Sequence, residues 1–210
     1  TYMAKITRPD GTVVETAQSQ VAESAAGSPY IMQLHKQSPN YEQAAAQGRK
    51  ADEMVYVTGE KFLPLSNPVE MVVIEARFFS GTMDGGKFIA TSLKPSPRFR
   101  DEGVHALVIA KMGPQWLPAR LSLTRAAVDG LRKFNNAVVE SKKPLEEYLL
   151  RLKCEMLPGS KPGVKYRKSF GEWEHKPGLL SGLKYDAALL GVCYEDVESW
   201  WQRVLAIVEK

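Results

Sequence analysis

The clearest pattern of apolar and polar positions lies between residues 105 and 139. An apolar run from Ala106 to Ala110 is too short for a globular helix, and the turn-forming Met112-Gly113-Pro114 follows it. The chain then returns as a second apolar segment from Gln115 to Leu123. Ser122 or Thr124 can cap a helix in which apolar residues recur at helical spacing. These are Ala127, Val128, Leu131, Phe134 and Val138. The pattern predicts strand, tight turn, strand and helix.

Further strands are predicted on both sides of this segment. Residues 54–65 indicate a short hairpin, and residues 70–79 are mostly β-branched or aromatic. The glycine-rich residues 80–86 predict a hairpin loop before a return strand over residues 87–93. Residues 145–157 fit a helix or a strand, and the glycine- and proline-rich segment that follows favours a long hairpin with residues 164–175.

The last predicted element is an amphipathic helix over residues 195–208. Val197, Trp200, Trp201 and Val204 share one side, and acidic residues stand at its start, where the helix dipole favours them. This helix either docks on its own domain or binds a partner. Many short strands, one central helix and glycine-containing loops together predict a mainly β protein, a small barrel with helices.

Charge is unevenly distributed along the 210 residues, although the net charge is only +4. Residues 87–170 contain 17 Lys and Arg against 7 Asp and Glu, whereas each flank has a balance of −3. A basic middle between acidic flanks is typical of proteins that bind a polyanion, and a lysine-rich solvated surface is the ordinary alternative.

The usual catalytic and metal-binding motifs are missing from the sequence. His35, His105 and His175 are isolated, and neither a phosphate-binding glycine loop nor a nucleophile motif is present. Cys154 and Cys193 are the only cysteines and do not have metal-ligand spacing. We therefore expect no enzyme activity, no cofactor and no metal. No apolar run reaches transmembrane length and no signal pattern is found, so we expect a cytoplasmic protein that does not enter a membrane.

Basic and aromatic residues alternate in the middle of the chain, as they do in proteins that bind single-stranded nucleic acid. The strongest cases are residues 94–100 and 165–170, because such clusters beside proline or glycine are difficult to bury. The predicted phosphate contacts are Lys94, Arg98, Arg100, Arg120, Lys165, Arg167 and Lys168, and the predicted stacking residues are Phe99, Trp116, Tyr166 and Phe170.

The order of these patterns over residues 27–175 resembles a group of bacteriophage-encoded single-stranded DNA-binding proteins of OB-fold type. The most specific part is the central strand and glycine turn, followed by Trp116, Pro118-Ala119 and a basic helix with Arg132 and Asn135. The resemblance implies an OB-like nucleic-acid-binding domain over residues 27–180. An N-terminal hairpin and arm, residues 1–26, and a C-terminal helical extension, residues 181–210, would flank it. It also implies a protein of the host cytoplasm that coats single-stranded DNA during phage or mobile-element replication or recombination.

One difference from this group lies at the end of the chain. Replicative proteins of this type often finish in a disordered acidic tail that recruits partners, whereas this sequence finishes in the tryptophan-bearing helix. If this helix does not dock on its own domain, residues 195–210 are the candidate site for a second copy of the chain or a replication partner.

Two other hypotheses follow from the same residues. The basic middle could bind an acidic protein, as in a phage interaction or inhibitory protein, or the protein could be a nuclease. Salt-sensitive binding to single-stranded DNA distinguishes the first hypothesis from the protein-binding one, and metal-dependent cleavage of single strands would support the nuclease.

Overall fold

The computed structural model describes residues 3–7, 11–17, 27–36, 40–84, 87–98 and 101–208. Most of the described strands belong to one large mixed sheet, and β1 and β2 form a separate hairpin. The strands are β1 (Met3–Thr7), β2 (Val13–Ala17), β3 (Tyr30–Gln33), β4 (Met54–Thr58), β5 (Lys61–Pro64), β6 (Val69–Asp84), β7 (Lys87–Ser92), β8 (Glu102–Met112), β9 (Gln115–Thr124), β10 (Tyr148–Pro158) and β11 (Lys165–His175). The helices are α1 (Tyr41–Ala46), α2 (Asp129–Ser141), α3 (Leu179–Gly182) and α4 (Ala187–Val208), with the 3-10 turns η2 (Arg125–Val128) and η3 (Leu145–Glu147).

The predicted mainly β fold with helices is confirmed. Strands β8 and β9 pair around the Met112-Gly113-Pro114 reversal, where Gly113 has a φ of 56° that suits glycine. The helix follows as η2 and α2, and the ambiguous residues 145–157 form η3 and β10, which pairs with β11 along its whole length. The turn of the N-terminal hairpin, residues 8–10, and most of the predicted arm lie outside the described residues.

Five strands of the large sheet and helix α2 are arranged in an order that is known from other β proteins. The strands follow one another across the sheet as β11-β10-β6-β8-β9, and α2 lies in the chain between β9 and β10. This is the strand order and helix position of an OB-fold, a five-stranded, partly open barrel. The sheet continues past β9 with β3, which is parallel to β9, and then with β4 and β5. The described strands do not close into the barrel that we expected, because β3 takes the place beside β9.

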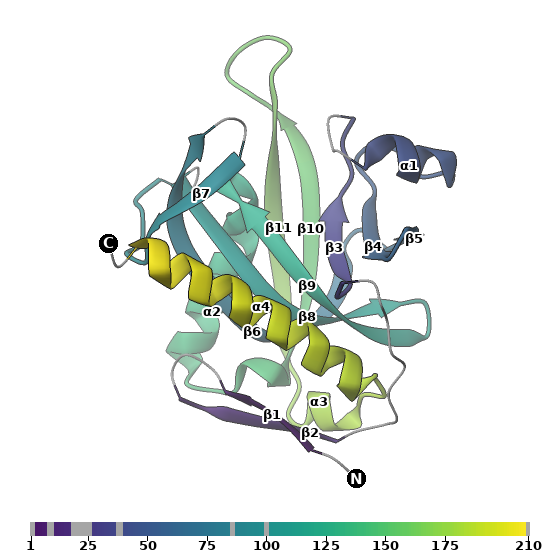
Figure 1. The fold of residues 1–210 in the computed structure, drawn as a ribbon, viewed down its shortest axis with the longest axis vertical. Coiled ribbons are helices and arrows are strands. Elements are labelled where there is room, and N and C mark those ends of the chain that lie inside the picture. The colour runs from purple at the N-terminus through teal and green to yellow at the C-terminus, as the bar shows by residue number, and fades with distance from the viewer. Residues whose placement is uncertain are drawn as a thin grey trace.

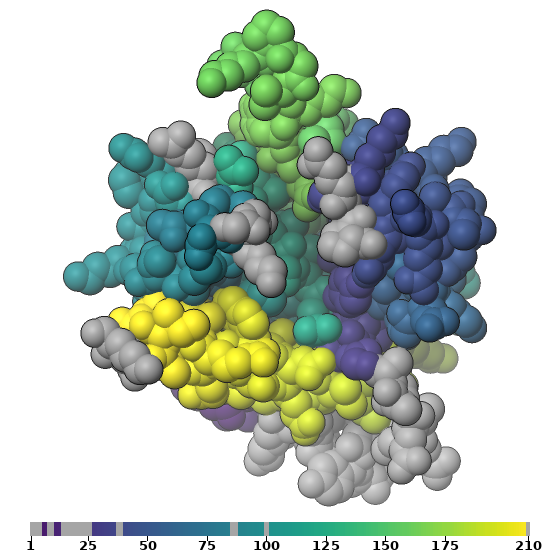
Figure 2. Space-filling view, turned by 45° about the horizontal axis from the view of Figure 1, so that its top comes forward, coloured from purple at the N-terminus to yellow at the C-terminus, as the bar shows by residue number. Residues whose placement is uncertain are grey.

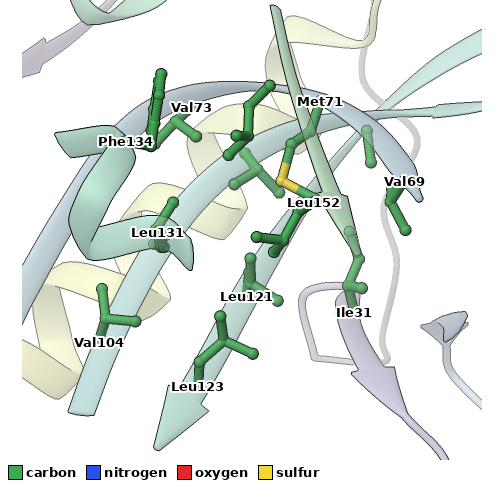
Figure 3. Close-up of a cluster of buried hydrophobic side chains, with 14 of the residues drawn as sticks. Ile31, Val69, Met71, Val73, Val104, Leu121, Leu123, Leu131, Phe134 and Leu152 are labelled. Atoms are coloured by element: carbon green, nitrogen blue, oxygen red, sulfur yellow. The ribbon is translucent and has the colours of Figure 1, made fainter. Parts of the chain in front are cut away.

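The inside of the curved sheet holds the main hydrophobic core. Leu131 and Phe134 of α2 are fully buried against the strands, and Phe134 lies edge-on to Tyr148 with ring centroids 6.0 Å apart. Figure 3 shows how residues from separate strands meet these two side chains, with Val73 and Met71 of β6, Leu121 of β9 and Leu152 of β10 among them. The apolar residues whose helical spacing predicted α2 are thus the residues that fill this core.

Helix α4 covers the outside of the same sheet. It crosses the sheet in front of β8 and β9, on the side opposite α2 (Figure 1), and it contacts β7, β8, β9 and β1. We call the apolar group beneath it the outer cluster: Ile6, Val72, Ile74, Leu107, Ile109, Leu190 and Cys193. The prediction that this helix begins near residue 195 was wrong, since it begins at Ala187, and its first two turns supply Leu190 and Cys193 to the outer cluster.

The glycine-rich residues 80–86 also differ from their prediction as a loop. Strand β6 runs to Asp84 and β7 starts at Lys87, so most of the segment is paired. Gly81 lies beside β7 so closely that an added Cβ would be 2.2 Å from the carbonyl oxygen of Ile89. Glycine is therefore required here for a close approach of two strands and not for a turn.

A second close approach joins α2 to β11, and it gives a testable pair of substitutions. In Gly130→Ala the new Cβ would lie 2.8 Å from Ser169 Oγ and 2.9 Å from the backbone N and C of Phe170, so we expect a loss of about 1–3 kcal/mol in unfolding free energy. In Gly191→Ala, within α4, nothing lies within 4 Å of the new Cβ, and we expect a gain of about 0.5–1 kcal/mol. Urea unfolding of both variants measures the two changes in unfolding free energy. Changes of the same sign in the two variants would contradict the packing described for Gly130.

Candidate nucleic-acid interface

The hairpin of β10 and β11 projects from the body of the protein and carries one side of the candidate interface (Figure 1). Successive side chains of a strand point to opposite faces, so Tyr166, Lys168 and Phe170 of β11 share one face. Tyr166 is 41% exposed and Phe170 is 40% exposed, which is unusual for aromatic side chains on a strand. Lys168 Nζ lies 5.4 Å from the centroid of the Phe170 ring.

The neighbouring strand adds a further cation to this face. Lys153 of β10 stands directly opposite Phe170 in the antiparallel register, and directly opposed side chains lie on the same face. Its side chain is 48% exposed and forms an ion pair with Glu155. We call Lys153, Tyr166, Lys168 and Phe170 the hairpin ladder. Lys153 was not predicted as a contact from the sequence. A hairpin with its turn at residues 159–164 pairs Lys153 with Phe170, so the turn signal could have identified it.

The hairpin ladder is held in place from the other face of β11. Ser169 is fully buried there and accepts a hydrogen bond of 2.9 Å from the backbone N–H of Gly130, while its own hydroxyl donates to the carbonyl of Ala127. At the strand edge, Lys168 Nζ lies 3.8 Å from Asp129 Oδ2. These contacts fix the middle of β11 to the start of α2, so the ladder has a defined position relative to the core.

The two predicted contacts on β9 lie elsewhere, beneath α4. Trp116 packs against the outer cluster, and Lys111 Nζ lies 6.0 Å from its ring centroid. Arg120 Nη2 donates to the carbonyl of Ser28 at 3.1 Å, and its Nε lies 3.9 Å from Asp196 Oδ2 of α4. The backbone N–H of Ser28 donates to the same carboxylate at 3.3 Å. The structure therefore does not bring Trp116 and Arg120 to the hairpin ladder.

A cluster of aromatic rings holds the C-terminal half of α4 over β6 and β8. The indole of Trp200 lies with its centroid 3.6 Å from that of His105 and 4.9 Å from that of Phe79. The His105 ring also contacts Ser122 Oγ, 2.9 Å from Nδ1. Burial, and to a smaller extent the charge of Arg120, lowers the pKa of His105 to about 4, so the ring is neutral at pH 7.

The predicted contacts before β8 are only partly described. Lys94 and Arg98 are exposed, whereas Phe99 and Arg100 lie outside the described residues. Ser80 Oγ of β6 donates to the Lys94 carbonyl at 2.6 Å, and the backbone N–H of Arg98 donates to Ser96 Oγ at 3.1 Å. In the chain, this loop lies between β6 and β8, which are the first and second strands of the OB-like set in chain order. The tip of the β10–β11 hairpin lies between the fourth and fifth.

Figure 2 shows that the surface is hollowed between these parts. The projecting β10–β11 hairpin borders the hollow at the top, β6 and β7 with the following loop on one side, and the region of β3–β5 and α1 on the other, with α4 below. The OB-fold binds oligonucleotides with the face of its second and third strands and with the loops after its first and fourth strands. Here α4 covers much of that face, which is formed by β8 and β9, so the hairpin and the loop before β8 are the accessible parts.

Comparison with protein-family models, with curated proteins and with solved structures found no match. Within the described ranges, no group of three or more His, Cys, Asp or Glu side chains is placed to hold a metal ion. None of the described helices is long and apolar enough to cross a membrane.

Proposed function

We propose that this protein binds single-stranded DNA with little sequence preference and coats it during phage or mobile-element replication or recombination. The observation that carries the proposal is the hairpin ladder, in which exposed aromatic rings and lysines share one face of a projecting hairpin. Proteins that hold single strands combine such rings, on which bases stack, with cations that follow the phosphates. The OB-like strand order supports the same class of ligand.

The exposure of the two rings favours a single strand over a duplex. Tyr166 and Phe170 are four residues apart on one strand, which corresponds to about 13 Å. The internal bases of a duplex are paired and stacked on one another, so they offer no free faces to the two rings. An extended single strand can place separate bases on the two rings and its phosphates near Lys153 and Lys168.

The proposal is tested by fluorescence anisotropy of a labelled oligo-dT at low and at moderate salt, with a duplex of equal length as competitor. We expect binding that the duplex does not displace and that weakens steeply with salt, because each neutralised phosphate releases counterions. No binding at low salt would contradict the proposal and would favour an acidic protein as the partner of the basic middle of the chain.

The expected partner site at residues 195–210 stays a prediction. Val197 and Val204 of α4 are buried within the domain, whereas Val192 and Ile207 of the same helix are exposed. A second copy or a replication partner would therefore have to use the outward side of α4.

A further inference from the structure

Arg167 lies where β11 approaches β3, two strands that are not paired by backbone hydrogen bonds. Its Nη2 donates to the carbonyl of Gln33 at 3.5 Å. Gln33 is itself buried, and its Nε2 donates to the carbonyl of Cys154 at 3.2 Å and to that of Asp52 at 3.3 Å. The two sides of the open barrel are thus joined here by side chains. Both of the elements that Arg167 connects border the hollow in Figure 2.

Arg167 differs from the other described arginines that are at least partly buried, because no described carboxylate lies within ion-pair distance of it. Among the described residues, every other arginine that is at least partly buried has a carboxylate oxygen within 4.0 Å. These are Arg49, Arg77, Arg120, Arg132 and Arg151. Arg98, Arg125 and Arg203 are exposed and are solvated by water. Arg167 is partly buried, yet no carboxylate of the described residues forms an ion pair with it, and its Nε is buried without a hydrogen-bond partner among them.

The surroundings of Arg167 disfavour its charge. Burial lowers the pKa of its guanidinium, and the negative charges of the Cys154 thiolate and the Asp52 carboxylate offset only part of that effect. The neighbouring His35 contributes no negative charge, and its own pKa is lowered by burial and then by the charge of Arg167. A desolvated cation without an ion-pair partner costs stability unless an anion binds to it. A guanidinium donates in a planar fork that matches two oxygens of a phosphate.

We propose that Arg167 binds one backbone phosphate of the single strand, at the point where β11 approaches β3. This inference rests on the proposed function and adds the path of the strand. Arg167 points to the face of β11 opposite the hairpin ladder, because it lies between Tyr166 and Lys168 in the strand. A strand that stacks on the ladder therefore crosses the free edge of β11 near residues 165–168 and places its next phosphates on the side of the hollow.

The test compares Arg167→Met with wild type, since methionine keeps the apolar stem and removes the charge. Without nucleic acid, we expect Arg167→Met to unfold at the same temperature as wild type or higher, because an uncompensated charge has been removed. Its affinity for oligo-dT falls about tenfold or more, the usual effect of losing a charged hydrogen bond, and the slope of log K against log salt decreases by about 0.7. Arg167→Lys is expected to keep the salt slope of wild type but only part of its affinity for oligo-dT.

The control is Arg151→Met, which removes an arginine of β10 that is paired with Glu70, with Nε 3.1 Å from Oε1. We expect this variant to bind oligo-dT as wild type does. A lower unfolding temperature of Arg167→Met with unchanged oligo-dT affinity would overturn the inference and assign Arg167 to a structural role, while leaving the proposed function intact.

A second readout uses inorganic phosphate alone and separates this inference from the proposed function. At constant ionic strength, phosphate in place of chloride raises the unfolding temperature of wild type and leaves that of Arg167→Met unchanged. An equal effect on both proteins would overturn the anion site at Arg167. If phosphate acts only on wild type but oligo-dT does not bind at low salt, the proposed function fails, the strand path fails with it, and the anion site alone is supported.

Discussion

Replacing Tyr166 and Phe170 together by alanine is expected to weaken oligo-dT binding by at least about 30-fold. Each stacked base contributes roughly 1–3 kcal/mol, so two lost platforms remove about 2–6 kcal/mol of binding free energy. The unfolding free energy should change little, because both rings are largely exposed and neither belongs to a described core cluster. Anisotropy titrations and urea unfolding of the double variant measure the two quantities separately.

A matched pair of lysines tests the ionic part of the hairpin ladder. Lys168 and Lys133 both approach Asp129 Oδ2, at 3.8 Å and 3.2 Å, so replacing either one removes a cation from the same carboxylate. Only Lys168 belongs to the ladder. We expect Lys168→Gln to lower the salt slope by about 0.7 and Lys133→Gln to leave it unchanged. Equal slopes for the two variants, together with an unchanged affinity of the Tyr166/Phe170 variant, would exclude the ladder as the binding surface.

The largest expected effect on stability belongs to Arg77, which joins β6 to α4. Its Nε is bonded to the Glu75 carboxylate, its Nη2 lies 2.7 Å from Glu198 Oε2, and its guanidinium carbon lies 5.6 Å from the Trp201 ring centroid. The side chains of Arg77 and Glu75 are both only 2% exposed. Arg77→Met removes the cation from a buried carboxylate, and such a loss costs about 3–5 kcal/mol.

Thermal and urea unfolding should therefore show a strongly destabilised Arg77→Met variant. For a protein of this size the melting temperature should fall by roughly 6–20 °C. The control is Lys111→Met, which breaks a pair between Lys111 Nζ and Glu70 Oε2 at 2.8 Å whose partners are 43% and 26% exposed. Such a surface pair contributes less than about 1 kcal/mol. Similar losses for the two variants would mean that the contact of Arg77 with α4 contributes little to the docking of the helix.

Local patterns in the sequence predicted most of the sheet. The reversal at Gly113 and the glycine- and proline-rich tip before β11 are turn signals that act over a few residues, so the two long hairpins follow from the sequence. The insertion of β3 beside β9 could not be predicted, because it pairs Tyr30 with Arg120, a residue 90 positions later in the chain, and no local pattern specifies it. The early start of α4 was missed because Gly191 and Asp186 interrupt the apolar pattern there.

The candidate site was predicted in composition but not in arrangement. The sequence identified β11 as basic and aromatic, and the alternation of its side chains would have separated Arg167 from Tyr166, Lys168 and Phe170. Nothing local indicated that Trp116 and Arg120 would lie beneath α4, since that depends on where a helix that begins only at Ala187 packs on the sheet. Whether the predicted residues contact nucleic acid stays a prediction.

The position of α4 in the chain also bears on biosynthesis. All the strands of the OB-like order leave the ribosome before α4, so Val72, Ile74, Leu107 and Ile109 remain uncovered on a nascent chain whose inner core can already form. Such a transient apolar face is a binding site for chaperones and a starting point for aggregation. Slow translation after β11 should therefore lengthen the time for which this face is exposed and lower the yield of folded protein.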